Sequence, residues 1–471
     1  MTAPAFRELS RLGSVDAAAA VVARLAERGL GSLATTATGA ELARLEHGTL
    51  LSLLAGWSKL SIARVGLLDP LTAMRLPWLV IAALGPCALY GLVAARRGPW
   101  VGALAAAALM GLPHWSHGVA VAERGIVLTS IALAAAWLAD RARRGRRRIL
   151  AGVGVAAVIG AGLAETHQVL WVLPWLVAHQ LWVERRWLRR SLRRGRVAVP
   201  AWLLLTLPLA PLLWIALDPA LWTAGPVGIA RDGLQSLAPR VEPTHYAGTV
   251  VLAPPVPGAY GPLRVLSNTP LWVLGLAVAG AMATLRRRAP VPPGAARPGS
   301  ALGLLALGVL WPTVAPNVLL DFPPLVALTQ PLFACGVALA VAELWAKVPR
   351  FGPALGAVAL LGVWVPTLVG LPSAGAARSA LPASLHARFL PDGSEVGVLA
   401  RDIDSLGRTE LSLAAPEVPA NYFAYLERTG RMRTAVVLAA GADATLARGA
   451  QPDATFTVTR RGQPLWSLTA R

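Results

Sequence analysis

Cysteine and acidic residues are scarce in this chain of 471 residues. Its two cysteines, Cys87 and Cys335, lie in apolar stretches, far from any CxxC or Cys/His pattern. Neither a disulfide framework nor a cysteine-based metal site follows from such spacing. Aspartate and glutamate together number 24 against 44 lysines and arginines, which gives a formal net charge of +20.

Charged residues of either sign are also few. They make up 14% of the chain, whereas hydrophobic residues make up 55% and the mean hydropathy is +0.56. Because this leaves too much apolar surface for one soluble core, lipid must be part of the solvent. The arginines cluster in short gaps between apolar runs, which is the pattern of membrane topology rather than of nucleic-acid binding. We therefore expect a membrane protein with no nucleic-acid partner.

Apolar runs of about 20 residues, the length that crosses the hydrocarbon layer, recur along the chain. They predict a mostly α-helical fold, a polytopic membrane bundle of about ten transmembrane helices that occupies residues 74–371. The expected spans are 74–95, 100–119, 125–139, 149–164, 169–183, 199–217, 270–285, 301–315, 323–344 and 352–371.

Basic clusters occupy every second gap between these spans, at 96–97, 141–148, 185–196, 286–288 and 347–350. Since lysine and arginine in short loops stay on the cytoplasmic side, the other gaps, including the long loop 218–269, are expected to face outward. An even number of spans places both termini outward too. The composition is typical of a GC-rich bacterial genome, so we expect a multi-pass inner (plasma) membrane protein whose active face and C-terminal domain lie outside the cytoplasm.

Residues 1–73 form the predicted outer N-terminal segment. Its first 47 residues contain no apolar run that could carry them across the membrane, so we predict one further helix upstream. Translocation of a short tail without a signal is the alternative. Residues 49–68 are apolar but include Lys59 and Arg64, and we expect an interfacial helix there. Its polar residues would face water, and its leucines and Trp57 would face the acyl boundary.

Residues 372–471 are predicted to form a small soluble α/β domain, because proline, serine and charged residues replace the apolar runs there. Short buried strands are expected at 395–400 and 434–439, and a helix at 421–431. Residues 454–459 and 464–469 flank an Arg-Arg-Gly-Gln turn and predict a hairpin. No nucleophile or metal motif stands out in this domain.

A series of short motifs accompanies the first spans. The series runs Asp16, Glu46-His47, Arg75-Leu76-Pro77, Gly111-Leu112-Pro113, Glu123-Arg124 and Thr166-His167. In this order, and with the predicted topology, it resembles the GT-C membrane glycosyltransferases of the protein O-mannosyltransferase and lipid A aminoarabinose transferase type. The acidic motif is degenerate, since Val15-Asp16-Ala17 stands where the family has an acidic pair.

The resemblance implies transfer of one sugar from a polyprenyl phosphate carrier to a lipid, glycan or protein acceptor on the outer side of the membrane. The family also has a helix ahead of its acidic loop, in agreement with the missing upstream helix. Within such an enzyme, Asp16 is the candidate catalytic residue, as general base or as ligand of a divalent metal cation. The alternative for Asp16 is a helix N-cap.

The departing polyprenyl phosphate carries negative charge and requires cations near the outer interface. Arg75 and Arg124 have the expected depth. The alternative for Arg75 is a snorkelling anchor at a helix end, and the alternative for Arg124 and its neighbour Glu123 is a structural salt bridge within the bundle. Further substrate-binding candidates are Glu123, Glu46, His47, His167, His245 and Tyr246.

Two other classes of protein remain open. A transporter or flippase of a lipid-linked substrate would need polar residues near the centres of its spans, and these spans have almost none. A non-catalytic membrane scaffold would accommodate the altered acidic motif. Membrane lipids are expected partners in every case.

Overall fold

The computed structural model describes residues 49–181, 199–218 and 265–286 with gaps, the hairpin 244–251, residues 327–370 with one gap, and the strands between 410 and 470. Contacts between Cα atoms divide the chain into two compact units, one of which holds residues 14–390 and the other the C-terminal residues 391–471. The described part of the larger unit is almost wholly helical, in agreement with the predicted class.

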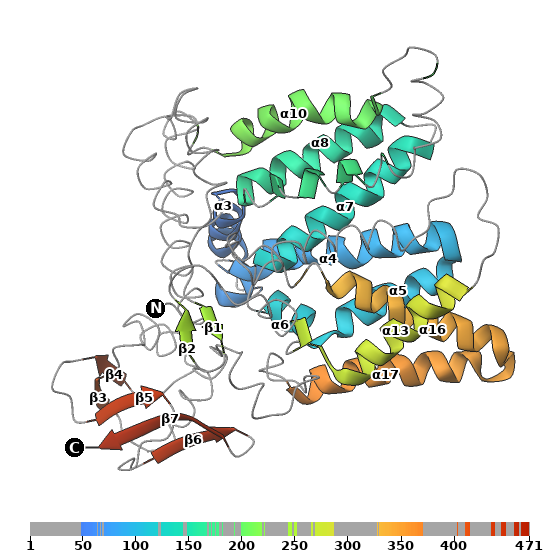
Figure 1. Ribbon diagram of the computed structural model, residues 1–471. Coiled ribbons are helices and arrows are strands. Elements are labelled where there is room, and N and C mark those ends of the chain that lie inside the picture. Colours follow the sequence, from blue (N-terminus) through green and yellow to red (C-terminus); the bar gives the residue numbers. More distant parts are fainter. Residues whose placement is uncertain are drawn as a thin grey trace. The chain divides into compact units, whose positions relative to one another are not determined.

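The long helices of the larger unit pack side by side in a row (Figure 1). One half of the row contains α10 (Ala201–Leu217), α8 (Arg148–Glu165), α7 (Arg124–Arg144) and α4 (Pro70–Arg97), each against the next. The row continues through α5 (Pro99–Gly111) to α16 (Gln330–Lys347), which packs against α13 (Leu271–Arg286) and α17 (Gly352–Gly370). The helix α17 also packs against α5.

Three helices of the described part are long and apolar enough to cross a membrane, namely Arg75–Arg97, Gly125–Ala142 and Arg148–Glu165. Shorter apolar helices are Leu50–Ile62, Pro99–Gly111, Trp202–Leu217, Leu271–Ala283 and Pro349–Val365. The predicted span 301–315 lies outside the described residues and 169–183 is described only in part, so the number of about ten spans stays a prediction.

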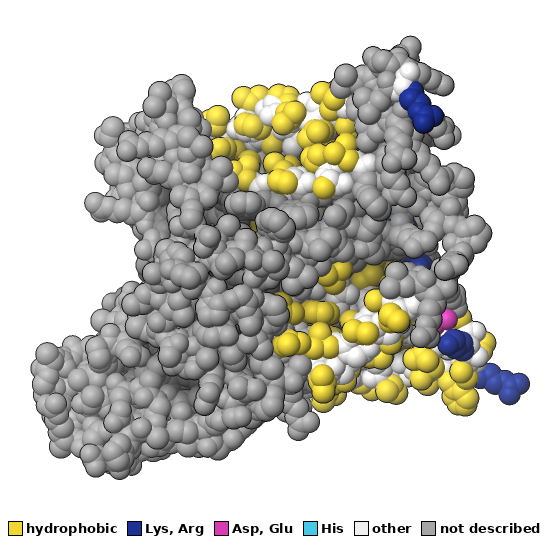
Figure 2. Space-filling view, viewed as in Figure 1, with side chains coloured by type: hydrophobic (Ala, Val, Ile, Leu, Met, Phe, Trp, Pro, Cys, Tyr) yellow, Lys and Arg dark blue, Asp and Glu magenta, His cyan; other side chains and the backbone are white. Residues whose placement is uncertain are grey.

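The two ends of the helical row differ in charge. One end, here called the arginine-rich end, carries basic residues at the end of α4 and α7, at the start of α8 and at the end of α16: Arg96, Arg97, Arg141, Arg148 and Lys347. Figure 2 shows lysine and arginine side chains along this edge and hydrophobic side chains on the flank beside it. The opposite end, here called the α3 end, is where α4 and α7 begin and where α8 and α10 finish.

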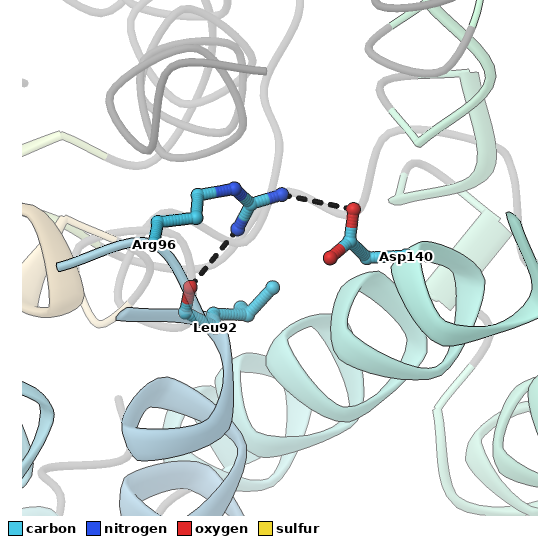
Figure 3. Close-up of polar contacts among 3 residues, drawn as sticks. All are labelled: Leu92, Arg96 and Asp140. Atoms are coloured by element: carbon cyan, nitrogen blue, oxygen red, sulfur yellow. Dashed lines mark hydrogen bonds and ion pairs between the residues drawn. The ribbon is translucent and has the colours of Figure 1, made fainter. Parts of the chain in front are cut away.

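A buried ion pair joins α4 to α7 at the arginine-rich end (Figure 3). The guanidinium of Arg96 donates to Oδ1 of Asp140 at 2.9 Å, and the two side chains are only 5% and 11% exposed. Arg96 also donates to the carbonyl oxygen of Leu92, four residues earlier in α4, at 3.0 Å. One guanidinium thus neutralises a carboxylate and adds a hydrogen bond near the C-terminus of α4, where positive charge is favoured.

The predicted span 100–119 is wrong as a single helix, because the structure divides it into α5 and α6 (Pro113–Ala120). Leu112 is extended between them, with φ −65° and ψ 130°, since the ring of Pro113 disfavours a helical residue before it. Two carbonyls exposed by the break accept hydrogen bonds from side chains: Ser116 Oγ donates to Met110 O at 2.5 Å, and Thr367 Oγ1 donates to Gly111 O at 2.6 Å. Trp364 Nε1 donates to Ala107 O, one turn earlier in α5, at 3.1 Å.

Tryptophan rings pack against glycines where helices approach one another. A Cβ added at Gly85 would lie 2.7 Å from the Trp115 ring, and one at Gly111 would lie 2.7 Å from Trp364. Gly91 meets Trp137 and Gly352 meets Trp345 even more closely. In lipid there is no hydrophobic driving force between helices, and small residues let them approach closely. These contacts therefore depend on complementary shape rather than on hydrophobicity.

The helices α13 and α16 run parallel in close backbone contact. A Cβ at Gly336 would lie 2.6 Å from Cα of Ala277, and a Cβ at Gly280 would overlap the carbonyl of Gly336 and approach N of Ala340 to 3.0 Å. Ala277 is therefore level with Gly336, and Gly280, three residues later in α13, lies between Gly336 and Ala340 of α16. The two helices thus run in the same direction, and this contact sets their register.

The C-terminal unit contains a five-stranded mixed sheet in the order β4-β3-β5-β7-β6. Its strands are β3 (Glu410–Ala414), β4 (Ala435–Leu438), β5 (Ala444–Arg448), β6 (Phe456–Arg460) and β7 (Gln463–Ala470). β3 is parallel to both β4 and β5, whereas β7 is antiparallel to β5 and β6. β4 and the β6–β7 hairpin were predicted. The strand expected at 395–400 and the helix expected at 421–431 lie outside the described residues.

Replacement of Asp140 by alanine should destabilise the helical unit by about 3–5 kcal/mol, because it leaves the Arg96 guanidinium buried without its carboxylate. Thermal unfolding in detergent measures the loss. The double variant Arg96→Met, Asp140→Leu should recover much of it, and Arg97→Ala, at an exposed position, should change little. A single Asp140→Ala variant as stable as wild type would contradict the role of the pair.

The substitution Gly280→Ala should destabilise the protein by about 1–3 kcal/mol, because the new methyl group forces α13 away from the backbone of α16. Gly275 lies in the same helix, and no atom of the described residues comes within 4 Å of a Cβ added there. Gly275→Ala is therefore the matched control and should be neutral or stabilising by about 0.5–1 kcal/mol. Equal unfolding temperatures for the two variants would refute the predicted contact.

Candidate functional site

A short helix, α3 (Thr49–Ser58), docks across the α3 end of the row, against α4 and α8. The carboxylate of Glu165, the last residue of α8, accepts a hydrogen bond from the backbone N–H of Leu51 at 3.3 Å. Leu51 is the third residue of α3, where backbone N–H groups lack partners within the helix. A carboxylate is unfavourable at the C-terminus of its own helix and favourable at the N-terminus of another. The bond therefore gives buried Glu165 a suitable electrostatic environment.

The other end of α3 is bound to the start of α4. Ser58 Oγ donates to the carbonyl oxygen of Ala73, and a short π-helix, η2 (Lys59–Ala63), follows directly. Polar bonds from two different helices thus fix α3 at both of its ends. Ser58 and Ser52 are both buried against the bundle.

The exposed face of α3 is apolar. Leu54 is 40% exposed and Trp57 57% exposed, whereas Ser52 and Ser58 are buried. The outward position of Trp57 agrees with the predicted interfacial helix. The expected placement of its polar residues is corrected for these two serines, which are buried against the bundle. Ser58 finds an acceptor there in the backbone carbonyl of Ala73. A polar interior therefore lies directly behind a surface suited to lipid.

Arg75 is in the first turns of α4, two residues after Ala73, and is half-buried. It is the basic candidate whose side chain the structure describes at the α3 end. Its position beside the attachment of α3 suits both the phosphate-binding role and the snorkelling role that the sequence leaves open.

Two buried carboxylates finish neighbouring helices at this end. Gly160 of α8 contacts Ala210 and Leu213 of α10, so these two helices run parallel and finish at the same level. Glu165 ends α8 at 6% exposure, and Asp218 caps α10 at 7% exposure. Within the described residues, no group of three histidine, cysteine, aspartate or glutamate side chains could hold a metal ion. The divalent metal proposed for Asp16 stays a prediction.

The other predicted site residues are placed only in part. Asp16, Glu46, His47, Glu123 and His167 lie outside the described residues.

Arg124 begins α7, at the α3 end, and its side chain is not among those described. His245 and Tyr246 lie in β1 (Thr244–Tyr246), which pairs with β2 (Thr249–Val251), so the loop expected at 218–269 contains a hairpin. His245 is opposite Val250, and Tyr246 is opposite Thr249.

Buried polar groups at the α3 end that sequence patterns missed include Asp218, Thr269 and Gln330. Each stands at a helix boundary beside a long apolar run. The position of a polar residue directly beside a long apolar run is the one sequence signal that could have identified these buried residues.

No family model matches the chain, and no curated protein matches it. Among solved structures, it is similar to the apo crystal structure of ArnT from Cupriavidus metallidurans, with 13% identity over 88% of this chain and 87% of that one and a TM-score of 0.46. The crystal structure of the same protein bound to undecaprenyl phosphate matches with the same identity and coverage and a TM-score of 0.43.

The apo oligosaccharyltransferase of Archaeoglobus fulgidus is also similar, with 13% identity over 72% of this chain and 49% of that one and a TM-score of 0.42. These proteins are glycosyltransferases of the GT-C fold, the superfamily that the sequence resembles. The likeness is distant, and no residue role is transferred from it.

Glu165→Ala should loosen α3 by about 1–3 kcal/mol, because it removes the acceptor at the N-terminus of that helix. Hydrogen exchange of the α3 amides should accelerate, while Glu165→Gln, which keeps an oxygen acceptor, should have a smaller effect. Glu343→Ala, a change of the same type in α16, is the control. Unchanged exchange in Glu165→Ala would show that the carboxylate does not hold α3.

Proposed function

We propose that the chain is a membrane glycosyltransferase that transfers one sugar from a polyprenyl phosphate carrier to an acceptor at the outer face of the membrane. One observation carries the proposal: α3 has an apolar exposed face and a polar buried face, and it lies across the end of the bundle where Arg75 stands. The motif series from Asp16 to His167 supports the same function.

The donor of such a reaction has a long apolar tail and a charged headgroup. The tail can stay in the bilayer along Leu54 and Trp57, while the headgroup reaches the polar groups behind α3. A half-buried guanidinium beside α3 would strengthen headgroup binding, because a partly desolvated guanidinium attracts phosphate more strongly than one in water. Arg75 is assigned this role, with Arg124 as its partner on α7.

The chemical step separates the sugar from the carrier phosphate and requires a proton acceptor for the incoming hydroxyl or amine. Asp16 is proposed as that base, or as the ligand of a cation that assists it. Arg75 and Arg124 would stabilise the negative charge that develops on the leaving phosphate. Glu46, Glu123, His47, His167, His245 and Tyr246 are proposed to contact donor or acceptor. The acceptor is a lipid, a glycan or a protein.

The arginine-rich end is proposed to face the cytoplasm, since short basic loops are retained there. The α3 end then faces outward in a multi-pass inner membrane. The wide separation of Arg96 and Arg141 from the α3 end supports this orientation, because basic residues of α4 and α7 gather at one end of both helices.

The purified protein should transfer radiolabelled sugar from polyprenyl phosphate donors. Asp16→Asn should lower the rate by at least about 100-fold while the protein stays folded, because a base contributes about that much. Arg75→Gln should lower donor binding, whereas Arg350→Gln, an exposed arginine near the opposite end, should not. Absence of transfer from every donor, with donor binding unchanged in Arg75→Gln, would overturn the proposal in favour of a scaffold.

A further inference from the structure

Two wholly buried polar side chains stand at the N-termini of α13 and α16. Gln330, the first residue of α16, is 0% exposed, and among the described residues neither its Nε2 nor its Oε1 has a hydrogen-bond partner. Thr269, two residues before α13, is also 0% exposed, and its Oγ1 has no partner in that part of the chain. Buried polar atoms are almost always hydrogen-bonded. Three buried polar atoms without a partner, near the starts of two neighbouring helices, therefore suggest that a ligand binds there.

The contact between α13 and α16 brings these groups to the same level. Ala277 meets Gly336, and the two helices run in the same direction. Leu271 precedes Ala277 by six residues, and Gln330 precedes Gly336 by six residues. Both helices therefore begin about 9 Å before their contact, and their N-termini lie next to each other.

The side chain of Gln330 extends toward this place. In an α-helix the Cα–Cβ bonds tilt toward the N-terminus, so a side chain on the first residue projects past the start of the helix. No side-chain cap closes α16 there, and its first turn contains no acidic residue. The first turn of α13 contains none either.

The electrostatics of the pair favour an anion. Each helix presents the positive end of its dipole, and here two such ends add. In α13, Val273 N–H bonds back to Pro270 O, and no described carbonyl outside the helix accepts from the N–H of Leu271 or Trp272. In α16, Pro331 has no N–H and Leu332 N–H bonds Thr329 O, so Gln330 contributes through its side chain. The buried carboxylates of the α3 end belong to α8 and α10, at the far side of the row.

We propose that the paired N-termini of α13 and α16 form a phosphate-binding site in which the Gln330 amide and the Thr269 hydroxyl donate to phosphate oxygens. Oε1 of Gln330 accepts from a protonated oxygen of the same ligand. The phosphate belongs to a lipid monoester or is free in solution. The site uses neither α4 nor α7, so the inference stands independently of the proposed glycosyl transfer and of Arg75.

The test uses the full chain in a phosphate-free detergent, with inorganic phosphate, farnesyl monophosphate and farnesol as probes. Bound ligand raises the unfolding temperature, and titration gives its Kd. Gln330→Leu and Thr269→Val should each raise the Kd for the phosphate compounds by about tenfold, as expected for the loss of one hydrogen bond to an anion. Thr206→Val, a buried threonine of α10 whose hydroxyl bonds Trp202 O at 2.7 Å, is the matched control and should leave the Kd unchanged.

The probes distinguish the two sources of phosphate. Binding of farnesyl monophosphate alone assigns the site to a lipid phosphate, and binding of both phosphate compounds shows that free phosphate is accepted as well. Equal binding of farnesol and farnesyl monophosphate overturns the proposal. So does phosphate binding that Thr269→Val and Gln330→Leu leave unchanged, which would place the anion elsewhere, for example at Arg75. Should Gln330→Leu fail to fold, Thr269→Val alone decides between these outcomes.

Discussion

The helical unit depends on one constraint: in apolar surroundings a backbone carbonyl or amide has to find a hydrogen-bond partner within the protein. The break at Leu112 leaves the carbonyls of Met110 and Gly111 without helical partners, and Ser116 and Thr367 donate to them. Thr367 belongs to α17, so the repair of one helix also docks another. The same need explains why Glu165 meets the first turn of α3.

Continuity of apolar residues was sufficient to predict α4, α7, α8, α10, α13 and α17 to within a few residues. It was insufficient at Leu112, because prolines at 77, 86, 208 and 211 remain inside α4 and α10. A proline in an apolar run is therefore compatible with a continuous helix or with a break. Which of the two occurs depends on whether neighbouring groups can form hydrogen bonds with the backbone that a break exposes. The helix α16 begins at Gln330, later than the apolar run at 323 suggested. β3 and β5 were not predicted, since they are short and their parallel pairing with each other has no local turn signal.

The candidate site was less predictable than the fold. Sequence order placed Arg75 near a helix start, and the structure has it in the first turns of α4 at the α3 end. It gave no indication of the bond between Glu165 and Leu51, because 114 residues separate them. Burial of Gln330 and Thr269 likewise depends on how closely α13 approaches α16, which glycines at two distant positions determine. Sequence motifs thus identified residues whose side chains could bind or react with a ligand. Which residues surround them is determined by tertiary packing, which the motifs do not show.

The position of β3 in the C-terminal sheet has a consequence for the order of folding. β3 is the first of its five strands in the chain, yet both of its neighbours, β4 and β5, are synthesised later. β5 in turn needs β7, whose pairing reaches Ala470. The sheet can therefore grow strand by strand only as far as β5, which pairs with β3, and a nascent chain that stops before Gln463 exposes β5 without one neighbour and β6 without its hairpin partner. Completion of this unit is a late event in biosynthesis, after the apolar helices that precede it have been made.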